Sequence, residues 1–131
     1  CGKPAVIETP PRLQDGTPFP TFYYATCPKL TGAISTLENG GLMAEMNERL
    51  KNDPKLAGEY AAAHEDYLAA RAVLKIDVPE VEGISAGGMP DRVKCLHSLV
   101  AHSLAAGLGV NPLGDEALAK LPKWWQDSPC E

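Results

Sequence analysis

Four cysteines are the residues of this sequence best suited to metal chemistry. They are Cys1, Cys27, Cys95 and Cys130, and none belongs to a Cys-x-x-Cys pair. Three of the four adjoin a glycine or a proline, where a turning backbone can present a ligand. Four thiolates fit either tetrahedral zinc or an iron-sulfur cluster. We therefore predict one metal site assembled from distant segments, and the missing zinc-knuckle spacing slightly favours a [4Fe-4S] cluster over zinc.

Two other interpretations of the cysteines stay open at this point. Two disulfides would require an oxidising compartment, which nothing in the sequence indicates. Four unrelated thiols are also compatible with the pattern, because free cysteine behaves as a small hydrophobic core residue.

The histidines are sorted by their positions on predicted helices. A helix over residues 90–106 would place Cys95 and His97 about 200° apart, so the two are not expected to share a metal, whereas Cys95 and His102 would lie on one face about 10 Å apart. His102 and His97 are predicted as catalytic residues that move a proton beside the metal, with a hydrogen-bonded core histidine as the alternative for His102. His64 flanks an apolar helix face and is expected to be a surface or packing residue.

A glycine corner precedes this helix, in the string SAGGMPDR at residues 85–92. Free backbone N–H groups and the dipole of a helix starting at Pro90 would attract an anion there. The string matches neither a Walker loop nor a Gly-x-Gly-x-x-Gly fingerprint, and the glycines are equally explained by a sharp turn. The predicted anion-binding residues are Ser85, Gly87, Gly88, Arg92 and Lys94.

The elements that must position these residues follow from periodicity and turn signals. Residues 4–9 and 19–26 are β-branched and aromatic, which predicts an antiparallel hairpin with a long loop. Pro28 suits a first helical position, and Asn39-Gly40-Gly41 ends that helix. A second helix covers residues 42–52, and a third begins at Asp53-Pro54 with an apolar face that continues to Leu74.

The remainder of the chain predicts one central helix and a short last one. Val93, Leu96, Val100 and Leu104 form one apolar stripe, and a second stripe beside it indicates a buried helix. The string DEALAKL predicts a short helix before the tail. We expect an α+β fold, a mostly helical single domain over residues 1–131 with a small N-terminal antiparallel β-hairpin. Its parts are a hairpin region at 1–27, three helices at 28–74, a central helix at 85–107, and a short helix with a tail at 108–131.

Composition narrows the classes of partner. The net charge is −5 and no block of lysine and arginine is present, so nucleic acid is not an expected partner. No apolar run approaches the roughly 20 residues that span a bilayer, so no membrane association is expected. Without a visible signal peptide the expected location is the cytoplasm, and the start at Cys1-Gly2 is interpreted as a truncated N-terminus. The expected partner is a small anionic ligand, and no protein partner is identified.

Three long strings carry a resemblance to a known family. PRLQDGTPFPTFYYATCPKLTGAISTLENGGLMAEMNERL, SAGGMPDRVKCLHSLVAH and the pattern GVNPLGDEAL…WW…PC resemble the actinobacterial family called domain of unknown function 501. The resemblance implies a small cytoplasmic bacterial protein whose gene lies near those for enolase, a septum-formation protein and an exopolyphosphatase. Family members often begin with a Cys-Pro-Cys-Gly string, of which Cys1-Gly2 would be the end. The resemblance implies no established activity.

The leading hypothesis is a small cytoplasmic metal-binding protein whose four cysteines converge on an iron-sulfur cluster or zinc. It extends to an enzyme that acts on a small anionic substrate held at the glycine corner. The alternative is a metal-free protein-interaction module linked to cell division or polyphosphate metabolism. A third hypothesis is a metal-free enzyme that binds phosphate at the same corner.

Overall fold

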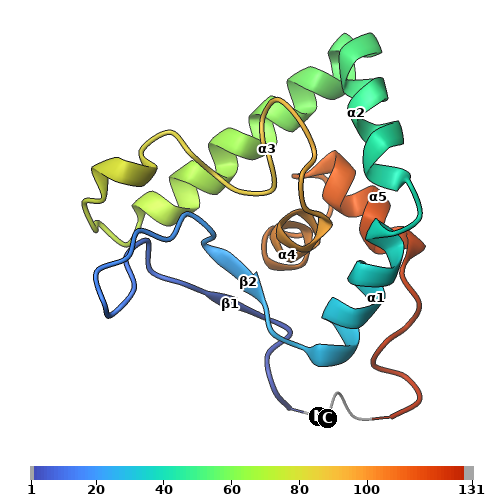
Figure 1. Cartoon of the computed structure of the whole chain (residues 1–131), viewed down its shortest axis with the longest axis horizontal. Helices are drawn as coiled ribbons and strands as arrows, with labels where there is room; N and C mark the ends of the chain where they lie inside the picture. The colour runs from blue at the N-terminus through green and yellow to red at the C-terminus, as the bar shows by residue number, and fades with distance from the viewer. Residues whose placement is uncertain (1, 129–131) are drawn as a thin grey trace.

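The fold is known from a computed structural model, which describes residues 2–128. Within that range the chain forms five α-helices and a two-stranded antiparallel sheet, which confirms the mostly helical α+β domain (Figure 1). None of these helices is long and apolar enough to cross a membrane. In chain order the elements are β1 (Val6–Glu8), β2 (Tyr23–Ala25), α1 (Pro28–Glu38), α2 (Leu42–Asn52), α3 (Pro54–Ala72), a 3-10 turn (Pro79–Val81), α4 (Leu96–Ala106) and α5 (Pro112–Lys120).

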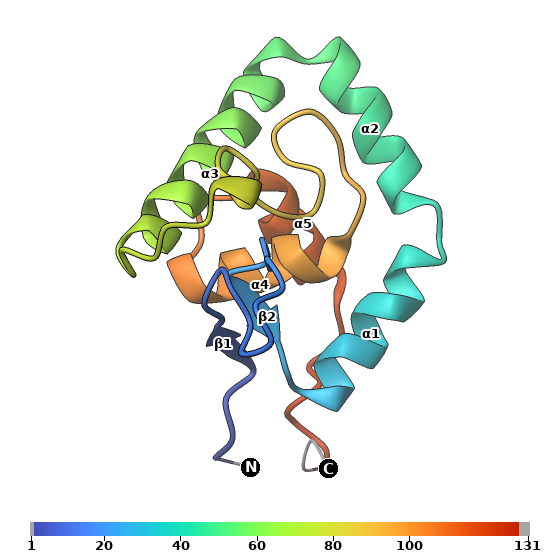
Figure 2. The same cartoon turned by 60° about the vertical axis from the view of Figure 1, so that its left-hand side comes forward.

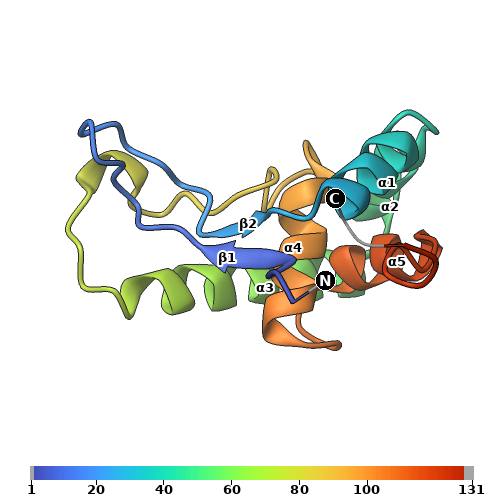
Figure 3. The ribbon, with the colours of Figure 1, turned by 90° about the horizontal axis from the view of Figure 1, so that it is seen from below.

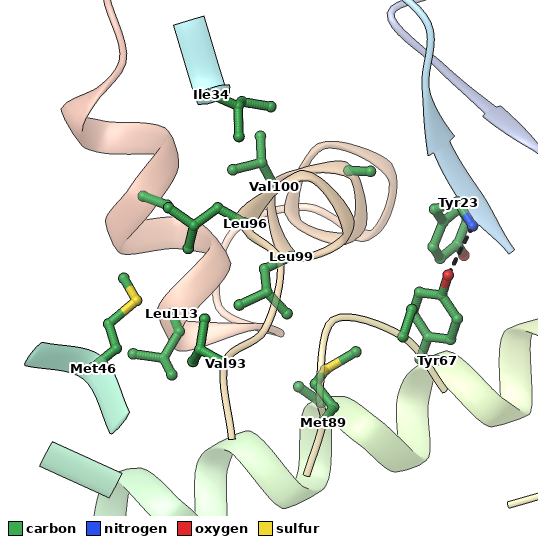
Figure 4. Packing of buried hydrophobic residues seen from close by; sticks show 14 of the residues in the cluster. Tyr23, Ile34, Met46, Tyr67, Met89, Val93, Leu96, Leu99, Val100 and Leu113 are labelled. Carbon is green, nitrogen blue, oxygen red and sulfur yellow. Dashed lines mark hydrogen bonds between the residues drawn. The ribbon is translucent and has the colours of Figure 1, made fainter. Parts of the chain in front are cut away.

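Helix α4 is the centre of the domain. Figure 1 shows it along its axis, with α3, α5, α1 and the hairpin around it. Figure 2 shows α1, α2 and α3 as an arch that encloses the loop before α4. The side chains of Leu96, Leu99 and Val100 are fully buried and point to different neighbours (Figure 4). The prediction of a central helix that is apolar on two stripes is therefore confirmed.

The hairpin lies against α4 and is fastened to α3 (Figure 3). Val6 pairs with Ala25 and Glu8 with Tyr23, so the predicted antiparallel pairing is confirmed, although each strand has three residues. Pro4 and Pro10 flank β1, and proline has no N–H with which to extend the ladder. The Tyr67 hydroxyl of α3 accepts hydrogen bonds from the backbone N–H groups of Phe22 and Tyr23, at 2.6 and 3.1 Å.

Helix starts follow one rule at two places. At Asp53-Pro54 the aspartate side chain accepts the Leu56 N–H at 3.1 Å and proline is the first helical residue, as predicted. The same signal at Asn111-Pro112 opens α5, where Asn111 Oδ1 accepts the Gly114 N–H at 2.9 Å. The prediction that the last helix begins at Asp115 is therefore wrong, because the cap and the proline start it three residues earlier.

The start of α4 also differs from the prediction. The helix begins at Leu96, not at Pro90, so the predicted helix over 90–106 and the central helix at 85–107 are too long at the N-terminal end. Gly87 and Gly88 have φ of +68° and +92°, and the Lys94 N–H donates to Gly87 O at 2.8 Å, which closes a turn. Asn47 of α2 accepts the Val93 N–H at 2.8 Å. These hydrogen bonds occupy backbone N–H groups that would belong to the first turns of a helix starting at Pro90.

Helices α4 and α5 cross in very close contact. Gly114 lies against the backbone of α4, and a Cβ there would be 2.9 Å from the carbonyl carbon of Leu99. Ala117, three residues after Gly114 on α5, is also fully buried. Because α4 carries Cys95 and His97 at its N-terminal end, this contact helps to set where those side chains lie.

Alkaline pH should destabilise the fold through the buried tyrosines of α3. Burial raises the pKa of Tyr67 to about 12 and also raises that of Tyr60. The tyrosines of the unfolded chain therefore lose their phenol protons at a lower pH than those of the folded chain. The stabilisation that the buried phenols contribute is fully present below pH 10 and is lost as the pH rises toward 12. For Tyr67, a pKa raised from 10 to about 12 corresponds to about 3 kcal/mol. Urea denaturation across this pH range should show the loss, and Tyr67→Phe should make it shallower; an equal loss in that variant would contradict the assignment.

Candidate functional site

Three metal-ligating side chains meet where α1 ends and α4 begins. Cys95 is the N-cap residue of α4, His97 lies in its first turn, and Glu38 is the last residue of α1. One donor atom from each, a thiol sulfur, an imidazole nitrogen and a carboxylate oxygen, lies within 4.8 Å of the other two. All three residues are half-buried. We call this group the Cys95 cluster.

The prediction that Cys95 and His97 point to different sides of one helix is wrong. It assumed that both residues lie within one helix, turning by about 100° per residue. Cys95 instead has extended backbone, with φ −152° and ψ 119°, because α4 begins one residue later. Its side chain therefore reaches the same side of the helix end as His97 and Glu38.

Hydrogen bonds hold Glu38 and His97 in place. Glu38 Oε2 accepts the Leu96 N–H at 2.8 Å, and Glu38 Oε1 lies 3.2 Å from His97 Nδ1. The other ring nitrogen, Nε2, lies 3.3 Å from the carbonyl oxygen of Thr31. One carboxylate thus caps α4 and orients an imidazole, and both interactions join α1 to α4.

One pair of donor atoms has nearly the separation that a zinc site requires. Two nitrogen or oxygen ligands in a tetrahedral zinc site lie about 3.3–3.6 Å apart, which follows from bonds of about 2.0–2.2 Å. The 3.2 Å between His97 Nδ1 and Glu38 Oε1 is already close to that separation, so an ion could take the place of the shared proton. With Nδ1 on a metal, the Nε2–H would donate to Thr31 O, the second contact that metal-binding histidines usually make. The Cys95 sulfur lies within 4.8 Å of the other two donors.

A cleft opens beside the Cys95 cluster. Its volume is about 710 Å³, and Cys95, His97 and Ser98 form one wall. Tyr23 and Tyr24 of β2 also line the cleft. A metal held by the cluster would therefore border a space large enough for a small molecule.

The other predicted ligands are placed only in part. Cys27 is buried at the N-cap of α1, where its carbonyl accepts the Thr31 N–H, so it lies one turn from the residue that contacts His97. Cys1 and Cys130 lie outside the described residues. The convergence of all four cysteines thus stays a prediction.

His102 lies in a different environment from His97. It is fully buried, with Nε2 2.8 Å from Asp66 Oδ2 and Nδ1 3.2 Å from Asn111 Nδ2. Asn111 also caps α5 through its oxygen, so its amide nitrogen is the group that faces the ring. The Tyr23 ring stacks on the imidazole at 5.7 Å. The catalytic role predicted for His102 and His97 is untested, and the contacts of His102 tie helices and hairpin together.

The glycine corner forms a turn in place of a helix start. The N–H groups of Met89, Arg92 and Lys94 donate to backbone carbonyls within the corner, so they do not point to a ligand. The Leu96 N–H at the true start of α4 is already taken by Glu38. The corner nevertheless borders a second cleft of about 590 Å³, and all five predicted anion-binding residues line it: Ser85, Gly87, Gly88, Arg92 and Lys94.

The comparison with protein families agrees with the resemblance seen in the sequence. The family model described as Protein of unknown function (DUF501) matches residues 1–119. The chain belongs to this family. No curated protein and no solved structure matches the chain. The DUF501 match includes every residue of the Cys95 cluster and of the glycine corner, whereas Cys130 lies beyond it.

Two residues of this DUF501 protein were missed as site residues. Glu38 looks like an ordinary acidic residue near a helix end, and no sequence pattern connects it to residues 58 positions later. His64 was expected at the surface or in packing, yet its Nδ1 lies 2.7 Å from the Ser85 hydroxyl. A polar residue beside the apolar face of α3 was the only available signal.

Proposed function

We propose that this protein is a small cytoplasmic metal-binding protein whose centre holds zinc on Cys95, His97 and Glu38. The observation that carries the proposal is the approach of three donor atoms to within 4.8 Å of one another, from two helices that are far apart in the sequence. One thiolate, one imidazole and one carboxylate form a donor set suited to zinc. Three protein ligands leave a fourth position, as in zinc sites that act on a substrate.

The zinc proposal differs from the iron-sulfur cluster that the sequence slightly favours. A [4Fe-4S] cluster would use mainly thiolates, from Cys27 and Cys95 together with Cys1 and Cys130. Within residues 2–128, the ligand candidates that group with Cys95 are a histidine and a carboxylate. Both the zinc site and the iron-sulfur cluster would use Cys95. Zinc would also use Glu38, whereas the iron-sulfur cluster would use Cys27, so mutation of these two residues distinguishes them.

The residues of the centre have defined tasks in this proposal. Zinc, when bound, would supply Lewis-acid chemistry at an oxygen of a bound molecule. Glu38 holds the N-terminal turn of α4 through the Leu96 N–H, and Thr31 O orients the imidazole of His97. Tyr23 and Tyr24, which line the cleft, would contact a bound molecule and help to exclude water from it.

Metal analysis of anaerobically purified protein tests the proposal. We expect one zinc per chain, with little iron or acid-labile sulfide. Cys95→Ser and His97→Ala should weaken zinc binding by more than about 100-fold, because even residues behind the ligands contribute about 10- to 100-fold. Glu38→Gln should also weaken it. The matched control is Tyr24→Phe, since Tyr24 lines the same cleft and is not a member of the cluster.

Other outcomes would identify a different function. Iron with sulfide that is lost in Cys27→Ser and Cys95→Ser, but kept in Glu38→Gln, would replace zinc by a cluster. Absence of metal from folded protein, even after incubation with zinc, would contradict both versions. That result would leave the metal-free interaction module or the phosphate-binding enzyme.

A further inference from the structure

A serine and a histidine meet beside the glycine corner, and neither belongs to the Cys95 cluster. Ser85 precedes the two glycines and is 1% exposed, and His64 lies on α3 and is 8% exposed. Ser85 Oγ is 2.7 Å from His64 Nδ1. This short bond connects the corner to the longest helix, and it brings together the two groups that nucleophilic catalysis by serine requires.

The hydrogen-bond geometry assigns the proton of the Ser85 hydroxyl. Its two neighbouring acceptors are His64 Nδ1 at 2.7 Å and the carbonyl oxygen of Met89 at 3.5 Å. A bond at 3.5 Å is very weak for a hydroxyl donor, so the proton is directed toward the imidazole. His64 then carries its own proton on Nε2 and accepts at Nδ1. In this arrangement the imidazole can take the proton as the serine oxygen attacks.

The residues after Ser85 provide unused backbone donors. Within residues 2–128, the N–H groups of Ala86, Gly87 and Gly88 donate to no protein acceptor. A Cβ at Gly88 would be 2.7 Å from Arg92 O, so only glycine fits at this position of the turn. The N–H of the residue that follows a nucleophilic serine is a recurrent donor to the oxyanion of acyl transfer.

The second cleft suits a small anionic molecule. It has a volume of about 590 Å³ and reaches Ser85 and both glycines. Arg92, Lys94 and Asp91 line its rim and are exposed, which gives a net charge of +1. The charge would favour a substrate that carries a carboxylate or a similar group at a distance from its reacting carbonyl.

We propose that Ser85 is a nucleophile with His64 as its base, and that the substrates are small carboxylic esters bearing a negative charge. Ser85 Oγ bonds to the carbonyl carbon while its proton passes to His64 Nδ1. The carbon–oxygen bond to the alcohol breaks, and the alcohol leaves with that proton. Water then attacks the acyl-Ser85 carbonyl, again giving a proton to His64, and releases the carboxylic acid with Ser85 restored.

Covalent labelling with an alkyl fluorophosphonate tests the proposal. Ser85 Oγ would bond to phosphorus, fluoride would leave, and His64 would take the proton. Peptide mapping should locate the label on Ser85 at a stoichiometry approaching one. Ser85→Ala should abolish it, and His64→Gln should slow it by about 100-fold or more, the usual contribution of a general base. Ser98→Ala is the matched control, because Ser98 is a similarly buried serine in the neighbouring cleft, and it should label like the parent.

Two further measurements keep the proposal falsifiable if the variants fold poorly. In the parent protein, 4-nitrophenyl hemisuccinate should protect Ser85 from labelling by the fluorophosphonate more strongly than uncharged 4-nitrophenyl acetate does. Cys95→Ser should label normally, because this site does not depend on the proposed zinc. No label on Ser85 of the folded parent, or equal labelling in folded His64→Gln, would overturn the proposal and leave the pair as a structural hydrogen bond.

Discussion

Gly114→Ala should destabilise the protein by about 3 kcal/mol or more, the upper end of what overpacking usually costs. A methyl group at this position would press on the carbonyl of Leu99 and on the Ser103 hydroxyl. Backbone cannot rotate away as a side chain can, so α5 must shift as a unit or separate from α4. The Gly114 N–H also donates to the cap residue Asn111, which ties the start of α5 to the same contact.

The control for this substitution is Gly58→Ala. Gly58 is an exposed residue within α3, and a Cβ there would meet nothing within 4 Å. Alanine is better than glycine in a helix by about 1 kcal/mol, so Gly58→Ala should stabilise the protein slightly. Urea denaturation should therefore show that the two substitutions change the free energy of unfolding in opposite directions. A stabilising Gly114→Ala would show that α4 and α5 are not in close contact.

Tyr67→Phe should cost about 2–4 kcal/mol. The Tyr67 hydroxyl accepts two backbone N–H groups, from Phe22 and Tyr23, and all three residues are buried. Phenylalanine would leave both donors without a partner, and each buried unpaired donor costs about 1–3 kcal/mol. The segment that enters β2 would lose its attachment to α3. Because Tyr23 stacks on His102 and lines the cleft beside Cys95, the wall of that cleft should loosen as well.

Tyr60→Phe is the matched control, one buried tyrosine two turns earlier on the same helix. Its hydroxyl makes a single hydrogen bond, donating to Arg92 O at 2.9 Å. Its loss should cost about 1 kcal/mol. Denaturation midpoints measure the difference, and hydrogen exchange should be faster at Phe22 and Tyr23 only in Tyr67→Phe. Equal costs and unchanged exchange would contradict the assigned role of Tyr67.

The sequence by itself determined the elements whose signals are local. Asp53-Pro54 and the spacing of apolar residues after it predict α3, because a side-chain cap and a helical stripe each act within a few residues. The two apolar stripes around Leu96 and Leu99 predict that α4 is central. The hairpin and the family resemblance were likewise available from the sequence alone.

Only the tertiary structure decided where α4 begins, and the candidate sites follow from that. Asn47 takes the Val93 N–H and Glu38 takes the Leu96 N–H, so two distant side chains compete with the helix for its first donors. Neither side chain is close in sequence, so no periodicity could reveal the competition. The same physical reason explains why Glu38 reaches His97 and why His64 reaches Ser85: these contacts arise from how α1 and α3 pack around the central helix and its preceding loop.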